Sequence, residues 1–170
     1  WWESDTQTTL AIDGIPGIGK STLAARFCKS VADRTHVSWV PIKDWDSPKS
    51  FLVALAELYA HLNRDRLMRQ AKSGNVDLSA VRRNLQKDAE GLRILLVMDD
   101  VQNASDELAP YICMLLEQMH EIDDGGQTKI IVTSRDVTTL YSRREVEVDH
   151  TIEEIHLEGL DRRGAMELLR

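Results

Sequence analysis

The sequence predicts an α/β fold in which a parallel β-sheet is flanked by helices on both faces. Short apolar runs alternate with helical patterns along the chain, as in sheets whose strands are joined by crossover helices. The run Ile94–Met98 is apolar at every position, which is typical of a central strand buried on both sides. A glycine-rich turn, Gly14–Gly19, connects the first apolar run to the first helical pattern. These three features favour strands and helices that alternate within one domain.

The first part of the chain is expected to form two strands with a helix between them. The strands cover Thr8–Asp13 and His36–Ile42, the second ending near Pro41. The helix covers Lys20–Ala32, where apolar side chains recur three and four positions apart and form one stripe. That stripe consists of Leu23, Ala24, Phe27, Cys28 and Val31.

Two further helices are expected before the third strand. Ser47 and Pro48 mark the start of the first, because a hydroxyl caps a helix well and proline suits the first helical position. Its inward face consists of Phe51, Leu52, Leu55, Leu58, Tyr59 and Leu62. Residues 71–77 are expected to form a loop. Asp77 can then cap a second helix, which Gly91 ends.

The remaining three strands are expected in the C-terminal half. They cover Arg93–Asp100, Lys129–Ser134 and Glu154–Leu157. A helix lies between the first two of these strands, and Pro110 falls close to its start. The inner stripe of this helix consists of Ile112, Leu115, Leu116, Met119 and Ile122. Asp161 is expected to cap a last helix at the end of the chain.

Length and composition limit the classes of protein to consider. The 170 residues suit one domain, and 42% hydrophobic with 29% charged residues is typical of a globular protein. The net charge is −7, and no lysine or arginine stripe stands out, which argues against a nucleic-acid partner and against contact with a membrane. Cys28 and Cys113 are expected to be free thiols, as in the reducing cytoplasm. The five histidines lack the spacing of metal ligands.

The glycine-rich turn matches a phosphate-binding loop, in which two glycines with four residues between them precede a lysine and a hydroxyl. Glycines let backbone N–H groups surround an anion, and the following helix points its positive end at the same place. The expected nucleotide-binding residues are Gly14, Ile15, Pro16, Gly17, Ile18, Gly19, Lys20, Ser21 and Thr22. Lys20 would bind the β- and γ-phosphates. The alternative is a glycine-rich turn with a surface lysine.

Two aspartates, Asp99 and Asp100, lie at the C-terminal end of the third strand, the end where ligands bind in open α/β sheets. If this strand lies near the first, Asp99 and Ser21 can together hold Mg²⁺. Asp100 would then lie close to the γ-phosphate of ATP, where a carboxylate can orient or deprotonate water. The alternative is that these aspartates only cap the turn that follows.

An arginine follows the fourth strand. Arg135 is expected on the same rim as the phosphate loop, where it can contact the γ-phosphate and act in catalysis together with Asp100. The alternative is a surface arginine paired with Asp136 or another acid.

With these motifs in place, the chain resembles the NB-ARC domain of the STAND class of P-loop NTPases. The segments "GIPGIGKSTLA", "ILLVMDDV" and "KIIVTSRD" are similar to the family's phosphate loop, acidic strand and arginine-bearing sensor strand, in the same order. The resemblance implies the strand order 2-3-4-1-5, with the sensor strand between the other two. It also implies a nucleotide-binding domain over residues 1–158 and the start of an ARC-type helical region over residues 159–170.

The same resemblance implies a signalling switch that binds ATP and ADP with Mg²⁺ and hydrolyses ATP slowly. Other domains of a longer chain, for effector and sensor roles, would be its partners, together with further copies of itself in the ATP state. Two alternatives belong to other classes. One is a scaffold that holds ADP without catalysis, and the other is a DNA-handling ATPase of the related ASCE group.

Overall fold

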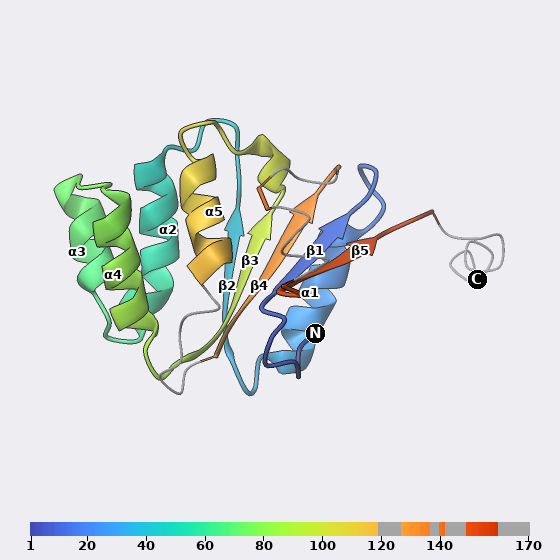
Figure 1. Cartoon of the computed structure of the whole chain (residues 1–170), viewed down its shortest axis with the longest axis horizontal. Coiled ribbons are helices and arrows are strands. Elements are labelled where there is room, and N and C mark those ends of the chain that lie inside the picture. The colour runs from blue at the N-terminus through green and yellow to red at the C-terminus, as the bar shows by residue number, and fades with distance from the viewer. Residues whose placement is uncertain (119–126, 137–139, 142–148, 160–170) are drawn as a thin grey trace.

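The computed structural model describes residues 1–118, 127–136, 140–141 and 149–159. Five strands form one parallel sheet in the order β2-β3-β4-β1-β5, which confirms the expected fold class and strand order (Figure 1). The strands are β1 (Thr9–Asp13), β2 (His36–Pro41), β3 (Arg93–Asp99), β4 (Gln127–Ser134) and β5 (Ile152–His156). Because all five strands are parallel, their carboxyl ends lie along the same edge of the sheet.

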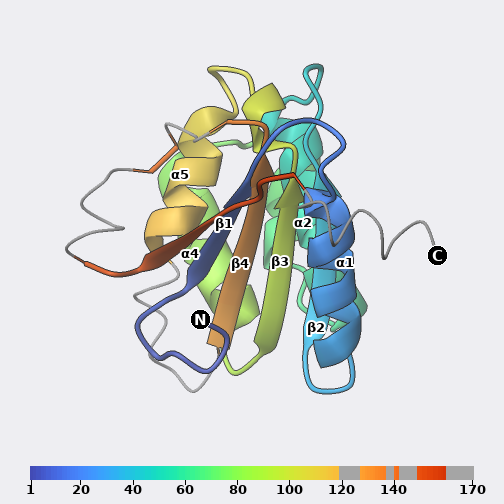
Figure 2. The same cartoon turned by 90° about the vertical axis from the view of Figure 1, so that its right-hand side faces the viewer.

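Helices cover both faces of this sheet. Figure 2 shows α1 and α5 on opposite sides of the strands. The helices are α1 (Lys20–Val31), α2 (Pro48–His61), α3 (Arg66–Ser73), α4 (Leu78–Ala89) and α5 (Ala109–Gln118), with a short 3₁₀ turn, η1 (Val101–Asn103), directly after β3. No helix in the described part of the chain combines the length and the apolar character needed to cross a membrane.

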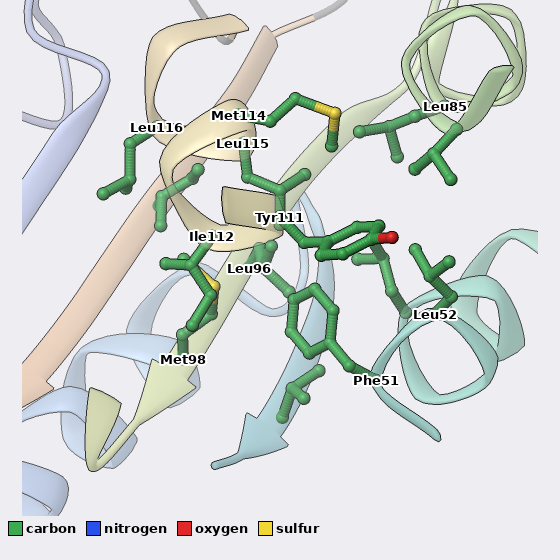
Figure 3. Close-up of a cluster of buried hydrophobic side chains, with 14 of the residues drawn as sticks. Phe51, Leu52, Leu85, Leu96, Met98, Tyr111, Ile112, Met114, Leu115 and Leu116 are labelled. Atoms are coloured by element: carbon green, nitrogen blue, oxygen red, sulfur yellow. The ribbon is translucent and has the colours of Figure 1, made fainter. Parts of the chain in front are cut away.

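The central strand β3 divides its side chains between two cores. Leu95 and Val97 pack in the smaller cluster, together with buried residues of α1. Leu96 and Met98 face the larger cluster, which also holds residues of α2 to α5. Figure 3 shows this larger cluster, with Phe51 close to Leu96 and Tyr111. The continuous apolar run therefore reflects burial on both faces, as the sequence predicts.

Local signals place most of the helix boundaries correctly. The Ser47 hydroxyl accepts a hydrogen bond from the Ser50 N–H, and the Ser50 hydroxyl accepts one from the Ser47 N–H, so the two residues form a capping box at α2. Asp77 caps α4 by accepting a hydrogen bond from the N–H of Ala80. Pro110 is the second residue of α5, in the first turn, where the N–H that proline lacks would have no acceptor within the helix.

Two expectations about local structure are wrong. Residues 71–73 belong to α3 and not to a loop, because Leu67 and Ala71, one turn apart, are fully buried against neighbouring helices. This helix is short and mostly polar, so its apolar pattern is too brief to detect. Leu23 is 40% exposed, because Ala24, Cys28 and Val31 form a narrower buried stripe on α1. The expectations at Met119, Ile122 and Asp161, and most of the region 159–170, lie outside the described residues.

A buried carboxylate joins α4 to α3. Asp88 on α4 is 0% exposed, and its Oδ2 accepts a hydrogen bond from the N–H of Leu67 at 2.8 Å. Leu67 lies in the first turn of α3, where N–H groups have no partner within the helix and favour negative charge. The Arg66 guanidinium lies 3.7 Å from the other carboxylate oxygen. Asp88 thus caps the neighbouring helix α3, a role that its position within α4 does not indicate.

Replacing Asp88 with alanine should lower the free energy of unfolding by about 2–3 kcal/mol, because a hydrogen bond to a charged group is lost and a buried N–H is left without an acceptor. Urea denaturation followed by circular dichroism measures this change. Asp65→Ala is the matched control. Asp65 precedes the same helix, but it is exposed and makes no capping hydrogen bond, so we expect a loss below about 1 kcal/mol. Equal effects of the two substitutions would contradict the capping role of Asp88.

Candidate nucleotide-binding site

The phosphate loop joins β1 to α1 through three glycines with positive φ. Gly14 has φ 146°, Gly17 has φ 80° and Gly19 has φ 107°. At Gly14 a side chain is also excluded by space, because a Cβ there would lie 2.6 Å from the carbonyl oxygen of Leu157. Glycine is therefore required at Gly14 both by backbone conformation and by the close approach of the chain that follows β5.

The start of α1 offers backbone donors to an anion. The N–H of Leu23 donates to the carbonyl of Gly19 at 2.8 Å, so the N–H groups of the three preceding helical residues have no acceptor within the helix. No acidic side chain lies in this first turn. The positive end of the helix therefore faces a site suited to phosphate.

Lys20 is held inside the loop. Its side chain is buried, with 6% of the residue exposed. The ammonium donates to the carbonyl oxygens of Gly14 at 2.7 Å and Ile15 at 3.2 Å. An ammonium carries three N–H donors, so it can bind a phosphate oxygen while it keeps these two contacts. This geometry excludes the alternative of a surface lysine.

The loop, the end of β3 and the end of β4 meet around one cavity of about 270 Å³. Its lining consists of Pro16, Gly17, Gly19, Lys20, Ser21, Thr22, Asp100 and Arg135. The structure therefore brings together most of the residues that the sequence selected. Gly14, Ile15, Ile18 and Asp99 do not line the cavity. Ile15 is 65% exposed.

Asp99 instead pairs directly with Ser21. The Ser21 hydroxyl donates to Asp99 Oδ1 at 2.8 Å, and the Thr133 hydroxyl donates to the same oxygen at 2.5 Å. A serine hydroxyl and a carboxylate are hard oxygen ligands of the kind that Mg²⁺ prefers, so this pair fits the expected metal. The sequence did not single out Thr133 for this contact. Its position follows from the register of β4, which places Thr133 beside Ile12 of β1.

Asp100 adopts the left-handed conformation, with φ 60° and ψ 47°. Its N–H donates to the Thr133 hydroxyl at 2.9 Å, which links the ends of β3 and β4. Asp100 precedes η1, but its side chain makes no capping hydrogen bond to that turn. Its side chain lines the cavity, so the alternative of a carboxylate that only caps the turn does not apply to Asp100.

Arg135 directly follows β4 and lines the same cavity. The structure, which describes both residues, shows no ion pair between Arg135 and Asp136. The pairing with Asp136 is therefore absent, whereas the exposure of Arg135 agrees with the other part of the alternative, an arginine on the surface.

A histidine–aspartate pair at the base of the phosphate loop was not predicted. His156, at the end of β5, has its Nδ1 2.6 Å from Oδ2 of Asp13, the residue directly before Gly14. The N–H of Leu157 also donates to the Asp13 carbonyl, at 2.8 Å. The hydrogen bond to Asp13, followed by the charge of that carboxylate, raises the pKa of His156 above its ordinary value of 6.5. The end of β5 is thus tied to the base of the loop.

Because folding raises the pKa of His156, the pair stabilises the fold at low pH. Its contribution is fully present below about pH 6.5 and is lost as the pH rises through the raised pKa. The stability difference between wild type and His156→Gln should therefore shrink between pH 6 and pH 8.5 in urea titrations. The same substitution in an Asp13→Asn background should show no such pH dependence. Parallel stability curves in the wild-type background would contradict the pairing.

The sequence profile of the AAA domain family matches residues 3–137. The chain belongs to this family. The matched range contains β1, the phosphate loop, β3 and the end of β4, and thus every residue that lines the cavity, together with Asp99. No curated protein sequence matches this AAA domain significantly.

Solved structures with the same fold include Cdc6p and ORC proteins. Cdc6p from Pyrobaculum aerophilum has a TM-score of 0.63 at 15% identity, over 95% of this chain and 41% of that one. The Aeropyrum pernix ORC1 protein, solved in complex with DNA, has a TM-score of 0.60 at 13% identity, over 95% of this chain and 42% of that one. A chain of Drosophila ORC bound to DNA and Cdc6 has a TM-score of 0.59 at 9% identity, over 92% of this chain and 51% of that one. The AAA domain thus spans about half, or less, of the chains it resembles.

These comparisons confirm a P-loop NTPase fold of the AAA family. They do not extend to the NB-ARC domain or to the STAND class, so that part of the resemblance remains a prediction. The expectation that nucleic acid is not a partner gains no support, because two of these similar structures contain DNA.

Proposed function

We propose that this AAA domain binds Mg·ATP and Mg·ADP and hydrolyses ATP slowly, as the switch module of a longer STAND-type signalling protein in the cytoplasm. The observation that carries the proposal is the convergence of the phosphate loop, Asp100 and Arg135 on one cavity, beside the hydrogen-bonded pair of Ser21 and Asp99. Each of these groups can bind or act on a different part of a nucleoside triphosphate.

The roles follow from chemistry and position. The N–H groups at the start of α1 and the ammonium of Lys20 would bind the phosphates. Ser21 and Asp99 would hold Mg²⁺, which when bound neutralises charge on the phosphate oxygens. Asp100 would orient or deprotonate water, and Arg135 would stabilise negative charge on the γ-phosphate.

Removing the metal tests this proposal. With Mg²⁺ present, we expect the chain to release phosphate from ATP at on the order of 10⁻⁴ to 10⁻² per second, the range of unassisted P-loop switch proteins. With excess EDTA, release should fall to the level of a protein-free control. ADP binding, measured by calorimetry, should also weaken without Mg²⁺. Failure to bind either nucleotide at millimolar concentration would overturn the proposal.

The proposed switch acts on the assembly of the longer chain into oligomers. We propose that the ATP state favours oligomers of the longer chain and that the ADP state is closed. Light scattering of the longer chain with ADP, or with a non-hydrolysable ATP analogue, tests this. Only the analogue should increase the measured mass. The same mass with both ligands would remove support for the STAND-type function while leaving nucleotide binding in place.

DNA handling is a second candidate, favoured by the similarity to the ORC1 and ORC structures that contain DNA. The net charge of −7 opposes it, because binding to DNA depends on neutralising phosphates. Fluorescence anisotropy with a labelled duplex at several salt concentrations distinguishes the two candidates. Binding that weakens steeply with salt would favour DNA handling, whereas no binding at low salt would favour the signalling switch.

A further inference from the structure

Gln102 connects the two residues that would act on the γ-phosphate. Its side-chain Nε2 donates to Oδ1 of Asp100 at 2.9 Å. Its Oε1 accepts a hydrogen bond from the backbone N–H of Arg135 at 3.1 Å. A single amide group therefore joins the carboxylate after β3 to the backbone after β4.

The orientation of this amide is determined by its two neighbours. A carboxylate can only accept, and a backbone N–H can only donate. If the amide were turned over, its oxygen would face the carboxylate and its NH₂ would face the N–H, so both hydrogen bonds would be lost. Glutamine thus satisfies both partners in one arrangement only.

Gln102 also lies on a well-anchored turn. It is the middle residue of η1, whose first residue, Val101, is 1% exposed. The N–H of Asn103 donates to the carbonyl of Asp100 at 3.0 Å, and the N–H of Ala104 donates to the carbonyl of Val101 at 3.0 Å. The turn therefore holds the backbone of Gln102 in place after β3.

Asp100 needs such support, because a left-handed backbone is an uncommon conformation for any residue other than glycine. Among the described residues, Oδ1 of Asp100 has Gln102 as its partner, whereas Oδ2 makes no hydrogen bond to another of these residues. A carboxylate fixed at one oxygen presents the other in a defined direction, and a small misplacement of such a group slows a reaction strongly.

We propose that Gln102 is a positioning residue for ATP hydrolysis, which fixes the Asp100 carboxylate and the Arg135 backbone relative to each other. The proposal rests on the proposed ATPase function. Gln102 does not line the cavity, and its side chain bonds to neither Ser21 nor Asp99, so its loss should affect the rate of hydrolysis and not the affinity for nucleotide.

Two substitutions separate the two contacts. Gln102→Leu removes both hydrogen bonds. Gln102→Glu keeps an acceptor for the Arg135 N–H but places a carboxylate against Asp100. Under single-turnover conditions we expect both variants to hydrolyse ATP about tenfold more slowly than wild type, with the Kd for Mg·ATP within about twofold. Amide exchange of Arg135, measured by NMR without nucleotide, should be about fivefold faster in Gln102→Leu and unchanged in Gln102→Glu.

Asn103→Leu is the matched control, because Asn103 lies on the same turn but its side chain bonds to Ile42 and not to the site. It should lower thermal stability and keep the wild-type rate. If Gln102→Leu hydrolysed ATP at the wild-type rate, only the role of Gln102 would be overturned. The same would follow if Asn103→Leu slowed hydrolysis as much as Gln102→Leu does. A wild-type protein that binds nucleotide but releases no phosphate would overturn the hydrolytic function itself, and the role of Gln102 with it.

Discussion

Replacing Lys20 with alanine is expected to weaken the binding of both ATP and ADP by about 100-fold or more. The ammonium is the only cationic side chain within the phosphate loop, and it is already buried and oriented by two loop carbonyls. A charge-assisted hydrogen bond to phosphate contributes up to about 3 kcal/mol, which corresponds to a factor of this size in affinity. Calorimetric titration with Mg·ADP measures the change directly.

Lys29→Ala is the control for this experiment. Lys29 lies in the last turn of the same helix and is exposed, so its removal changes the net charge by the same amount without touching the site. Its affinity for ADP should stay within about twofold of wild type. Unchanged binding in Lys20→Ala would contradict the assignment of the phosphate loop, and with it every role proposed for the residues around the cavity.

The second large effect is expected for Asp100→Asn, which should reduce phosphate release by about 100-fold while nucleotide affinity stays within about twofold. Asparagine tolerates the left-handed backbone, and its oxygen can still accept the hydrogen bond from Gln102. The substitution therefore keeps the shape of the site and removes only the charge that would orient or deprotonate water. Phosphate release from ATP in a single turnover measures the rate.

Asp106→Asn provides the matched comparison, because Asp106 is an exposed aspartate shortly after the same turn. It should hydrolyse ATP at the wild-type rate. Equal rates at background level for wild type and Asp100→Asn would favour a scaffold that binds nucleotide without catalysis. Equal rates well above background would instead show that Asp100 does not act on water.

Local sequence patterns identified most of the fold and the centre of the site. The apolar run Ile94–Met98 predicted a strand buried on both faces, and Ser47 with Pro48 predicted the start of α2. These signals act over a few residues, so they need no knowledge of the rest of the chain. The helix α3 was missed because its burial at Leu67 and Ala71 depends on packing against other helices.

The strand order came from a resemblance to a family and not from periodicity. Apolar spacing shows that a segment is a strand, but it does not show which strand lies beside it. Once β4 lies between β1 and β3, Thr133 is placed where its hydroxyl can contact both Asp99 and Asp100. Nothing in the local pattern at Thr133 distinguishes this contact from an ordinary buried hydroxyl.

The sequence by itself determined the phosphate loop, its lysine and the acidic end of β3, because conformation and charge at these positions depend on residue type and near neighbours. Only the tertiary structure decided that Gln102 joins Asp100 to Arg135 and that His156 pairs with Asp13. These contacts cross between strands that are distant in the chain. Their partners are set by the order and register of the parallel sheet, which bring the carboxyl ends of β1, β3, β4 and β5 to one edge.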